Sequence, residues 1–347
     1  MIELRSDTFT MPSREMLEYI LEAKLGDNVY NEDLAVIELE EVGANLLNKE
    51  ASLLFPSGTM ANLASIMGHS NRGTSIIVGD ESDIYIYEAG GATVCGGVIY
   101  NPIKTNDKGE MDLLKIEEKL KLDFSDPQYS KPSLICIETP HNRRGGVTLS
   151  IDYLKELSNI SLKYGIPIHM DGARIFNAAI SLGVEPSEIS QYADSIQFCL
   201  SKGLGAPVGS LVVGKKEFIN KIYYHRKMLG GGMRHSGIIA APGIYALKNR
   251  IDRLKEDHDN AFYFAKKISN IKGIRCDSKN VMTNTVIFKL VNEKINIYDF
   301  MKKVGEKGLN ISEIGNHNLR AVTYYNISKK MLDDAVKIIE KVLEDFE

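Results

Sequence analysis

A lysine, an aspartate and a serine each stand just after an apolar run of this sequence. They are Lys202 in "SIQFCLSKGLGAPVG", Asp171 in "IPIHMDGAR" and Ser57 in "FPSGTMAN". Lysine and aspartate are seldom buried without a partner, so their positions indicate a binding site rather than a core. The amine can bond to a carbonyl, the carboxylate can pair with a cation, and the serine opens a turn that suits an anion.

Each of these features also has a simpler explanation. The "FPSG" turn leads into a helix near Thr59, whose free N–H groups and dipole suit a phosphate, and two hydroxyls could add donors. Alternatively, Ser57 or Thr59 only caps that helix. Asp171 could merely pair with Arg174 and shape a turn. Lys202 could lie at the surface, although Gly203 and the glycine two residues later would let a flat ligand approach.

The elements that carry these residues favour the functional interpretation. Short apolar runs alternate with helical patterns from about residue 50 to 215, which is typical of an α/β domain with a largely parallel sheet. In such sheets ligands bind beyond the carboxyl ends of the strands. Asp171 and Lys202 are one strand–helix–strand step apart, so we expect both at this edge.

A phosphate-binding helix end, a strand-end aspartate and a strand-end lysine are together what pyridoxal 5'-phosphate requires. Asp171 would keep the pyridine nitrogen protonated, so that the ring can accept electrons. Lys202 would form the Schiff base. The joint pattern therefore predicts a pyridoxal phosphate enzyme with the aspartate-aminotransferase fold.

The pattern changes along the chain and predicts three parts. Residues 1–30 read as an N-terminal arm and helix, and residues 31–248 as a large cofactor-binding α/β domain. From residue 249 to 347, long amphipathic helices and a few strands predict a small α+β C-terminal domain.

The composition is that of an ordinary globular protein. Of 347 residues, 44% are hydrophobic and 25% charged, and the formal net charge is -4. This balance gives no reason to expect nucleic acid or a membrane as partner, and the first residues lack the apolar region of a secretory signal. The four cysteines form no CxxC pair and the seven histidines are scattered, so no metal site is predicted. We expect a cytoplasmic protein.

Seven motifs, in order along nearly the whole chain, resemble the low-specificity L-threonine aldolases. They are "LRSDT", "GDNVYNED", "FPSGTMAN", "PHNRRGG", "HMDGARIFNA", "CLSKGLGAPVGS" and "KMLGGGMR". The resemblance implies a fold-type I pyridoxal phosphate enzyme with a mostly parallel seven-stranded sheet. It implies a carbon–carbon lyase that cleaves L-threonine or L-allo-threonine to glycine and acetaldehyde, by a retro-aldol reaction from the external aldimine.

The resemblance also implies roles for individual residues. The cofactor would be held by Ser57, Gly58, Thr59, Asp171, Arg174, Lys202 and Arg234, the last reaching a neighbouring subunit's phosphate. The substrate would be held by Ser6, Tyr30, His141, Arg174 and Arg320. Lys202, His141 and the residue at position 83 are the catalytic candidates, and His141 would act on the β-hydroxyl directly or through water, unless it is structural. Homodimers or homotetramers with active sites at the dimer interface are implied.

Two positions depart from the family pattern. In "GDESDIYIYE" Asp83 stands where the family has a histidine that stacks on the cofactor ring, and Tyr324 stands where a histidine often follows "AVT". A carboxylate offers no aromatic face. Alternatively, the register shifts locally, Asp83 points away, and Tyr85 or Tyr87 covers the ring. These departures leave open a related β-eliminating lyase, or a cofactor-binding protein without turnover.

Overall fold

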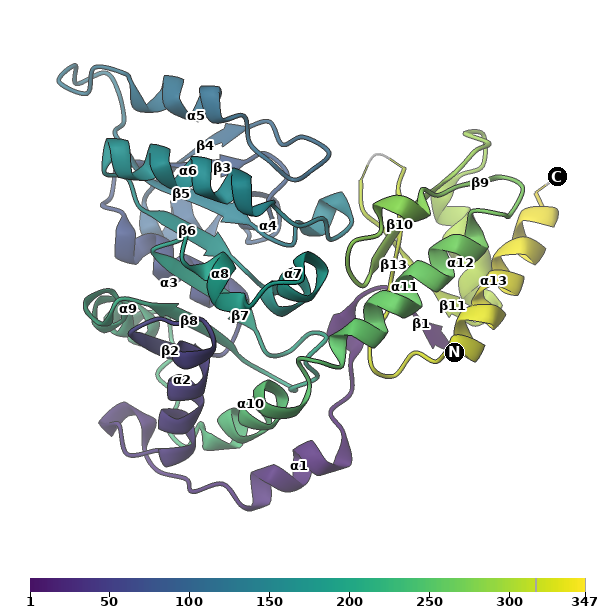
Figure 1. Cartoon of the computed structure of the whole chain (residues 1–347), viewed down its shortest axis with the longest axis horizontal. Coiled ribbons are helices and arrows are strands. Elements are labelled where there is room, and N and C mark those ends of the chain that lie inside the picture. Colours follow the sequence, from purple (N-terminus) through teal and green to yellow (C-terminus); the bar gives the residue numbers. More distant parts are fainter. Residues whose placement is uncertain (316, 347) are drawn as a thin grey trace.

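A sheet of seven strands lies at the centre of the larger part of the molecule (Figure 1). The structure is a computed structural model that describes residues 1–315 and 317–346. In spatial order the strands are β2 (Ala51–Phe55), β8 (Ser210–Gly214), β7 (Ser195–Cys199), β6 (Ile168–Asp171), β5 (Pro132–Glu138), β3 (Ser75–Gly79) and β4 (Ile99–Ile103).

Strand β8 runs against both of its neighbours, β2 and β7, whereas the other adjacent pairs in this sheet are parallel. Residues 200–209 join β7 directly to β8, and this loop is too short for the crossover that parallel neighbours need. The predicted, mostly parallel seven-stranded α/β sheet is thus confirmed. Lys202 lies in the loop that reverses the chain.

Helices cover both faces of this sheet, because successive side chains of a strand point to opposite sides. Leu54 packs with one layer of helices, whereas Leu53 and Phe55 pack with the other. The first layer holds α2 (Leu34–Leu46), α5 (Leu113–Leu120), α6 (Ile151–Tyr164), α7 (Ile175–Leu182), α8 (Pro186–Ser190) and α10 (Gly237–Asn249). The second holds α3 (Gly58–His69), α4 (Asp83–Ile86) and α9 (Lys216–Met228).

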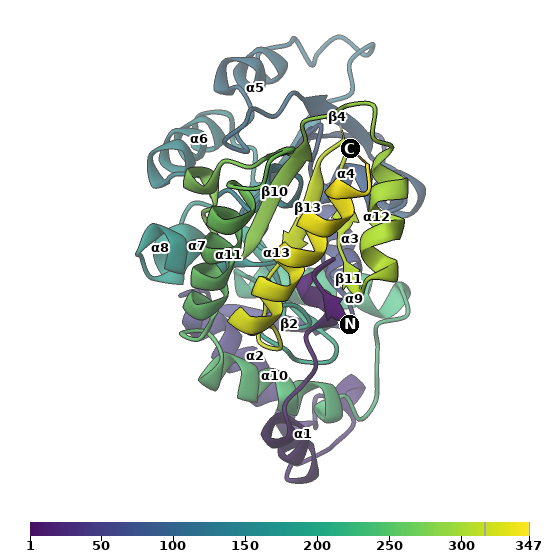
Figure 2. The same ribbon diagram turned by 90° about the vertical axis from the view of Figure 1, so that its right-hand side faces the viewer.

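The C-terminal part builds a second sheet beside the first, and Figure 2 views the molecule from that side. Its antiparallel strands are β12 (Ser312–Glu313), β13 (Leu319–Val322), β10 (Thr285–Leu290) and β9 (Ile274–Arg275). Helices α11 (Leu254–Ile268), α12 (Ile297–Glu306) and α13 (Lys329–Glu344) complete its core. The small α+β part is confirmed. We propose a domain boundary at residues 248 and 249, because α10 and most of α11 pack in different cores.

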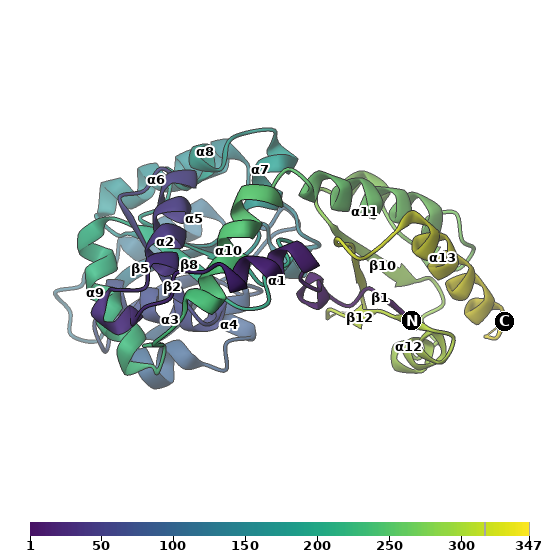
Figure 3. The same ribbon diagram turned by 90° about the horizontal axis from the view of Figure 1, so that it is seen from below.

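The N-terminal segment touches both parts. Strand β1 (Ile2–Glu3) pairs in parallel with β11 (Leu309–Asn310), and Leu4 joins the C-terminal core. The chain then crosses to α1 (Arg14–Leu21), which packs on α10 (Figure 3). We propose residues 1–30 as an arm that ties the two parts together. In the portion of the chain that the structure describes, no helix has the length and apolarity to cross a bilayer.

Candidate active site

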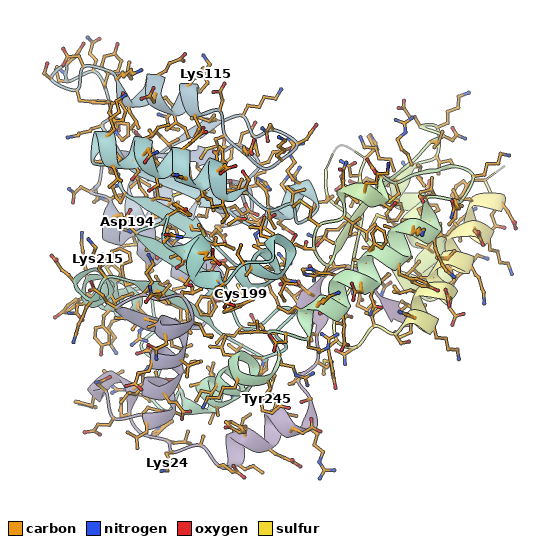
Figure 4. The ribbon with its side chains drawn as sticks, in the orientation of Figure 1. Lys24, Lys115, Asp194, Cys199, Lys215 and Tyr245 are labelled. Atoms are coloured by element: carbon orange, nitrogen blue, oxygen red, sulfur yellow. The ribbon has the colours of Figure 1, made fainter. Side chains whose placement is uncertain are left out.

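A cavity of about 290 Å³ opens at the carboxyl ends of β6 and β7. Its walls include Ser57, Gly58, Thr59, Asp83, Asp171 and Lys202. Figure 4 labels Cys199 at this edge of the sheet and Asp194, just before β7, at the opposite edge. A larger groove of about 900 Å³ between α5 and the start of α6 contains none of these six residues. The smaller cavity is the candidate active site, because it combines an amine, carboxylates and a helix N-terminus.

The N-terminus of α3 forms one wall of the cavity. Ser57 caps this helix, since its Oγ accepts the N–H of Met60 at 3.2 Å. Other N–H groups of the first turn stay available to an anion. A Cβ at Gly58 would lie 3.0 Å from Sγ of Cys199 and 3.1 Å from Nε2 of Gln197, so a side chain would crowd the wall. The turn therefore presents backbone donors at close range, as a phosphate requires.

Asp171 ends β6 and is only 4% exposed. Its Oδ1 accepts the N–H of Ala173 at 3.0 Å, and its Oδ2 accepts Nδ2 of Asn62 at 2.9 Å. The turn-shaping ion pair with Arg174 does not form, because Arg174 binds Asp7 instead. Burial raises the pKa of the Asp171 carboxyl, so a cation beside it would stabilise the ionised form. A protonated ring nitrogen fits this environment.

A buried chain of hydrogen bonds fixes the Asn62 amide behind Asp171. Asn62 Oδ1 lies 3.0 Å from Nε2 of His169, and Nδ1 of His169 and Nε2 of His69 each lie 2.8 Å from Oγ of Ser195. Burial lowers the pKa of His169 to about 3 and that of His69 to about 4, so both rings are neutral at pH 7. One proton arrangement satisfies the chain: each Nε2–H donates and the serine hydroxyl donates to Nδ1. Asn62 is then oriented to donate to Asp171.

Glu88 shares the same amide donor. Nδ2 of Asn62 also lies 2.9 Å from Oε1 of Glu88. Burial, followed by the nearby Asp171, raises the pKa of Glu88 to about 8. Glu88 is therefore protonated at neutral pH, which leaves the ionised form to Asp171.

Lys202 lies in the β7–β8 loop and lines the cavity. Its ammonium favours the ionised forms of Asp171, Glu88 and Asp7. The flanking glycines serve the loop rather than a ligand. Gly205 has φ +81°, which glycine adopts most readily, and a Cβ at Gly203 would lie 3.0 Å from Leu254.

Arg174 is neutralised within the chain. Its Nε and Nη2 donate to the two carboxylate oxygens of Asp7 at 2.8 and 2.7 Å, and Nδ2 of Asn284 lies 3.3 Å from the same carboxylate. Asp7 comes from the N-terminal arm and Asn284 from the small domain. This buried pair therefore joins three segments of the chain beside the cavity, and the predicted contact of Arg174 with the substrate stays a prediction.

Arg320 on β13 meets neutral acceptors. Nη1 donates to Oδ1 of Asn142 at 2.8 Å, Nη2 to the Arg5 carbonyl at 2.9 Å, and Nε to Oγ of Ser312 at 3.3 Å. Ser6, another predicted substrate contact, accepts the N–H of Thr8 at 3.2 Å and caps the short helix η1 (Asp7–Phe9). Arg320 is the stronger candidate for an anionic ligand, because its charge has no counter-ion among the described residues.

His141 is 1% exposed and is absent from the cavity walls. Its Nδ1 lies 4.0 Å from Oε1 of Glu138, and within residues 1–315 and 317–346 neither ring nitrogen has a hydrogen-bond partner. Burial lowers the pKa of His141 to about 4, so the ring is neutral at pH 7. Its predicted role as base stays a prediction.

Asp83 begins α4 and lines the cavity, and both of its carboxylate oxygens lie 3.2 Å from Nδ2 of Asn142. Tyr87 also lines the cavity, and its hydroxyl lies 2.6 Å from Nη1 of Arg143. Tyr85 instead packs edge-on against Tyr100. Both Asp83 and an aromatic ring therefore border the site.

The second departure, Tyr324, has a structural explanation. It lies in the core of the small domain, and its hydroxyl donates to the carbonyl of Glu3 at 2.9 Å. This bond fastens β1 of the N-terminal arm to the small domain.

Tyr30 and Arg234 lie together outside the cavity walls. The Arg234 guanidinium stands 5.9 Å from the Tyr30 ring centroid and pairs with Asp27 at 3.0 Å. Both residues are exposed in the single chain.

Three residues of the site were not singled out from the sequence, although each lies in a quoted motif. Asn62 is one helical turn after Thr59 in "FPSGTMAN", Glu88 ends "GDESDIYIYE", and Asp7 follows Ser6 in "LRSDT". Only for Asn62, one turn after Thr59 on α3, did helical spacing offer a signal.

Known proteins resemble this chain over most of its length. A sequence profile of the Beta-eliminating lyase family matches residues 3–291. The chain is 42% identical to the low specificity L-threonine aldolase of Escherichia coli K12 over 332 residues, or 96% of each chain. It is 39% identical to low-specificity L-threonine aldolase 1 of Arabidopsis thaliana, over 94% of this chain and 92% of that one.

A solved structure shares the fold. The threonine aldolase of Leishmania major superposes with a TM-score of 0.84 at 15% identity, covering 99% of this chain and 100% of that one. The profile and the sequence relatives together confirm the resemblance of the motifs. The chain belongs to the Beta-eliminating lyase family, and within it to the low-specificity L-threonine aldolases.

Proposed function

We propose that this chain is a pyridoxal 5'-phosphate-dependent aldolase that cleaves L-threonine and L-allo-threonine to glycine and acetaldehyde. The observation that carries the proposal is that Lys202, Asp171 and the N-terminus of α3 line one cavity. The relatives named as L-threonine aldolases support the same activity.

Pyridoxal 5'-phosphate is the cofactor of this family. When bound, it supplies an aldehyde that joins amines and a ring that draws electrons from the carbon beside the amine. The first turn of α3, with Ser57 and Thr59, would hold the phosphate. Asp171 would face the ring nitrogen, and Lys202 carries the amine for the aldehyde.

The remaining residues would hold the substrate and move one proton. Arg320 of β13, together with Ser6 of the "LRSDT" motif, would bind the substrate carboxylate and thereby orient the Cα–Cβ bond. A positioned base contributes roughly 10²–10⁴ in rate when that bond breaks. His141 is the proposed base, acting on the β-hydroxyl through water, because its ring is neutral and both nitrogens lack protein partners in the described chain.

Product analysis tests the reaction. The purified holoenzyme is incubated with L-threonine, L-allo-threonine and L-serine, and the products are identified. Glycine and acetaldehyde from either threonine support the proposal. A 2-oxo acid and ammonia would instead identify a β-eliminating lyase, and absence of turnover with bound cofactor would indicate a cofactor-binding protein.

The subunit arrangement and location complete the proposal. A homodimer or homotetramer would bring Arg234 and Tyr30 to a neighbouring subunit's site, which is supported by their exposure in the single chain. A cytoplasmic location is supported by the four free cysteines, as is usual in a reducing compartment.

A further inference from the structure

Arg320 is a cation with spare donors next to the candidate site. A guanidinium has five N–H groups, and three hydrogen bonds to neutral acceptors leave two N–H groups free. Burial and then the nearby Arg174 lower the pKa of Arg320, whereas Asp7 and Asp83 act in the opposite direction. Two free N–H groups suit the two oxygens of a carboxylate, provided that the guanidinium is held in one orientation.

The side-chain amide of Asn142 joins Arg320 to Asp83. Its Oδ1 accepts from Nη1 of Arg320 at 2.8 Å, and its Nδ2 lies 3.2 Å from each oxygen of Asp83. An amide has one accepting and one donating end, so the two ends are not interchangeable. A carboxylate at the Nδ2 end holds Oδ1 toward the guanidinium. Without it, Asn142 loses its partner at Nδ2, and the amide is held only by the guanidinium that it has to orient.

Glu138 holds Asp83 and Asn142 in place. It ends β5, and its Oε2 accepts the N–H of Asp83 at 2.8 Å while its Oε1 accepts the N–H of Asn142 at 2.7 Å. One buried carboxylate thus keeps the start of α4 beside the short helix η4 (Asn142–Arg144). Since Arg320 belongs to β13, the link crosses from the large sheet to the small one.

We propose that Asp83 is a positioning residue that acts through Asn142 to aim Arg320 at the α-carboxylate of the amino-acid substrate. The inference rests on the proposed function, because it requires an amino acid in the cavity. It explains why a carboxylate lines a site for an anionic substrate: Asp83 is bound by Asn142 and acts on the substrate through Arg320.

Ligand titration of the holoenzyme tests this chain of contacts. Cofactor absorbance is followed while glycine, which has the carboxylate, or 1-amino-2-propanol, which lacks it, is added. For Asp83→Ala we expect the Kd of glycine to rise about tenfold, in the range of one hydrogen bond to a charged group. The Kd of 1-amino-2-propanol should change less than about twofold, since no carboxylate is present for Arg320.

Two further variants separate positioning from folding. Asn142→Ala breaks the same link at a residue outside the cavity walls, so it should weaken the binding of glycine but not that of 1-amino-2-propanol. This variant replaces Asp83→Ala if the Asp83→Ala protein does not fold. Asp83→Asn keeps an acceptor for Asn142 and should restore much of the glycine affinity. Asp80→Asn is the matched control, in the segment between β3 and α4. Oδ1 of Asp80 accepts the Thr105 N–H at 2.8 Å, and both affinities should match wild type.

The outcomes distinguish this inference from the proposed function. If wild-type holoenzyme responds to neither ligand, the proposed function fails and the inference with it. If wild type responds but Asp83→Ala and Asn142→Ala weaken both ligands equally, or neither, the positioning role is overturned while the proposed function stands. Selective loss of glycine binding supports the inference.

Discussion

The buried pair of Asp7 and Arg174 allows a quantitative test of how the N-terminal arm is held. Asp7 is 0% and Arg174 9% exposed, and two hydrogen bonds of 2.8 and 2.7 Å join them. Asp7→Asn keeps the shape and one acceptor but leaves the guanidinium buried without a counter-ion. We expect the free energy of unfolding to fall by about 3–5 kcal/mol, the usual cost of removing one partner of a buried pair. Urea unfolding of both proteins measures this difference.

The same pair predicts the pH dependence of that difference. Burial alone would raise the pKa of Asp7, but the Arg174 guanidinium holds it well below its ordinary value of 3.8. A lowered carboxyl pKa contributes stability that is present above the ordinary pKa and is lost as the pH falls below it. The gap between wild type and Asp7→Asn should therefore be constant near neutral pH and shrink below about pH 4.

An exposed pair of equal length is the control. Nε of Arg14 lies 2.7 Å from Oε1 of Glu18 on the surface of α1. Glu18→Gln should cost far less than Asp7→Asn, because solvent screens exposed pairs. If the two substitutions cost the same, or if Asp7→Asn costs less than about 1 kcal/mol, burial does not set the strength of this pair and the reasoning is refuted.

Three further predictions concern the cavity and its surroundings. Lys202→Ala should abolish aldolase activity and the cofactor-labelled peptide that borohydride reduction produces from wild type; a labelled peptide of unchanged position would exclude Lys202. Because burial and then Asp171 raise the pKa of Glu88 from 4.5 to about 8, the native state keeps a proton that the unfolded state loses, and stability falls as pH rises between these values. Urea unfolding of the cofactor-free protein measures how the free energy of unfolding changes with pH. Glu88→Gln should remove about 1.4 kcal/mol per pH unit from this slope between about pH 5 and pH 7.5. An unchanged slope would contradict a protonated Glu88 in the native state. If Arg234 serves a neighbouring subunit, a mixture of the inactive Arg234→Ala and Lys202→Ala proteins should regain activity after re-association. Roughly a quarter of wild-type activity is expected, because half of random dimers are hybrids and each hybrid has one intact site of two. No recovery would assign Arg234 to the site of its own chain.

The sequence by itself determined the elements and the edge at which the chemistry lies. Apolar runs with turn residues predicted the strands, and Asp171, Lys202 and Ser57 each follow such a run. Strand ends in a parallel sheet share one edge, so local spacing was enough to bring these three residues to one cavity. The motifs also carried the family, because their order extends over nearly the whole chain.

Only the tertiary structure decided which polar groups meet around that edge. Asp7 and Arg174 are 167 positions apart, and Asn142 and Arg320 are 178 positions apart. Spacing along one segment reports which face of a helix or strand a residue occupies, but not which distant segment packs against that face. For this reason Asp171 is a plausible partner of Arg174 on sequence alone, and the sequence predicts no partner for Asp83. Packing of the arm and the small domain against the sheet pairs Arg174 with Asp7 and connects Asp83 to Arg320, because a buried charge is stable only where a partner meets it.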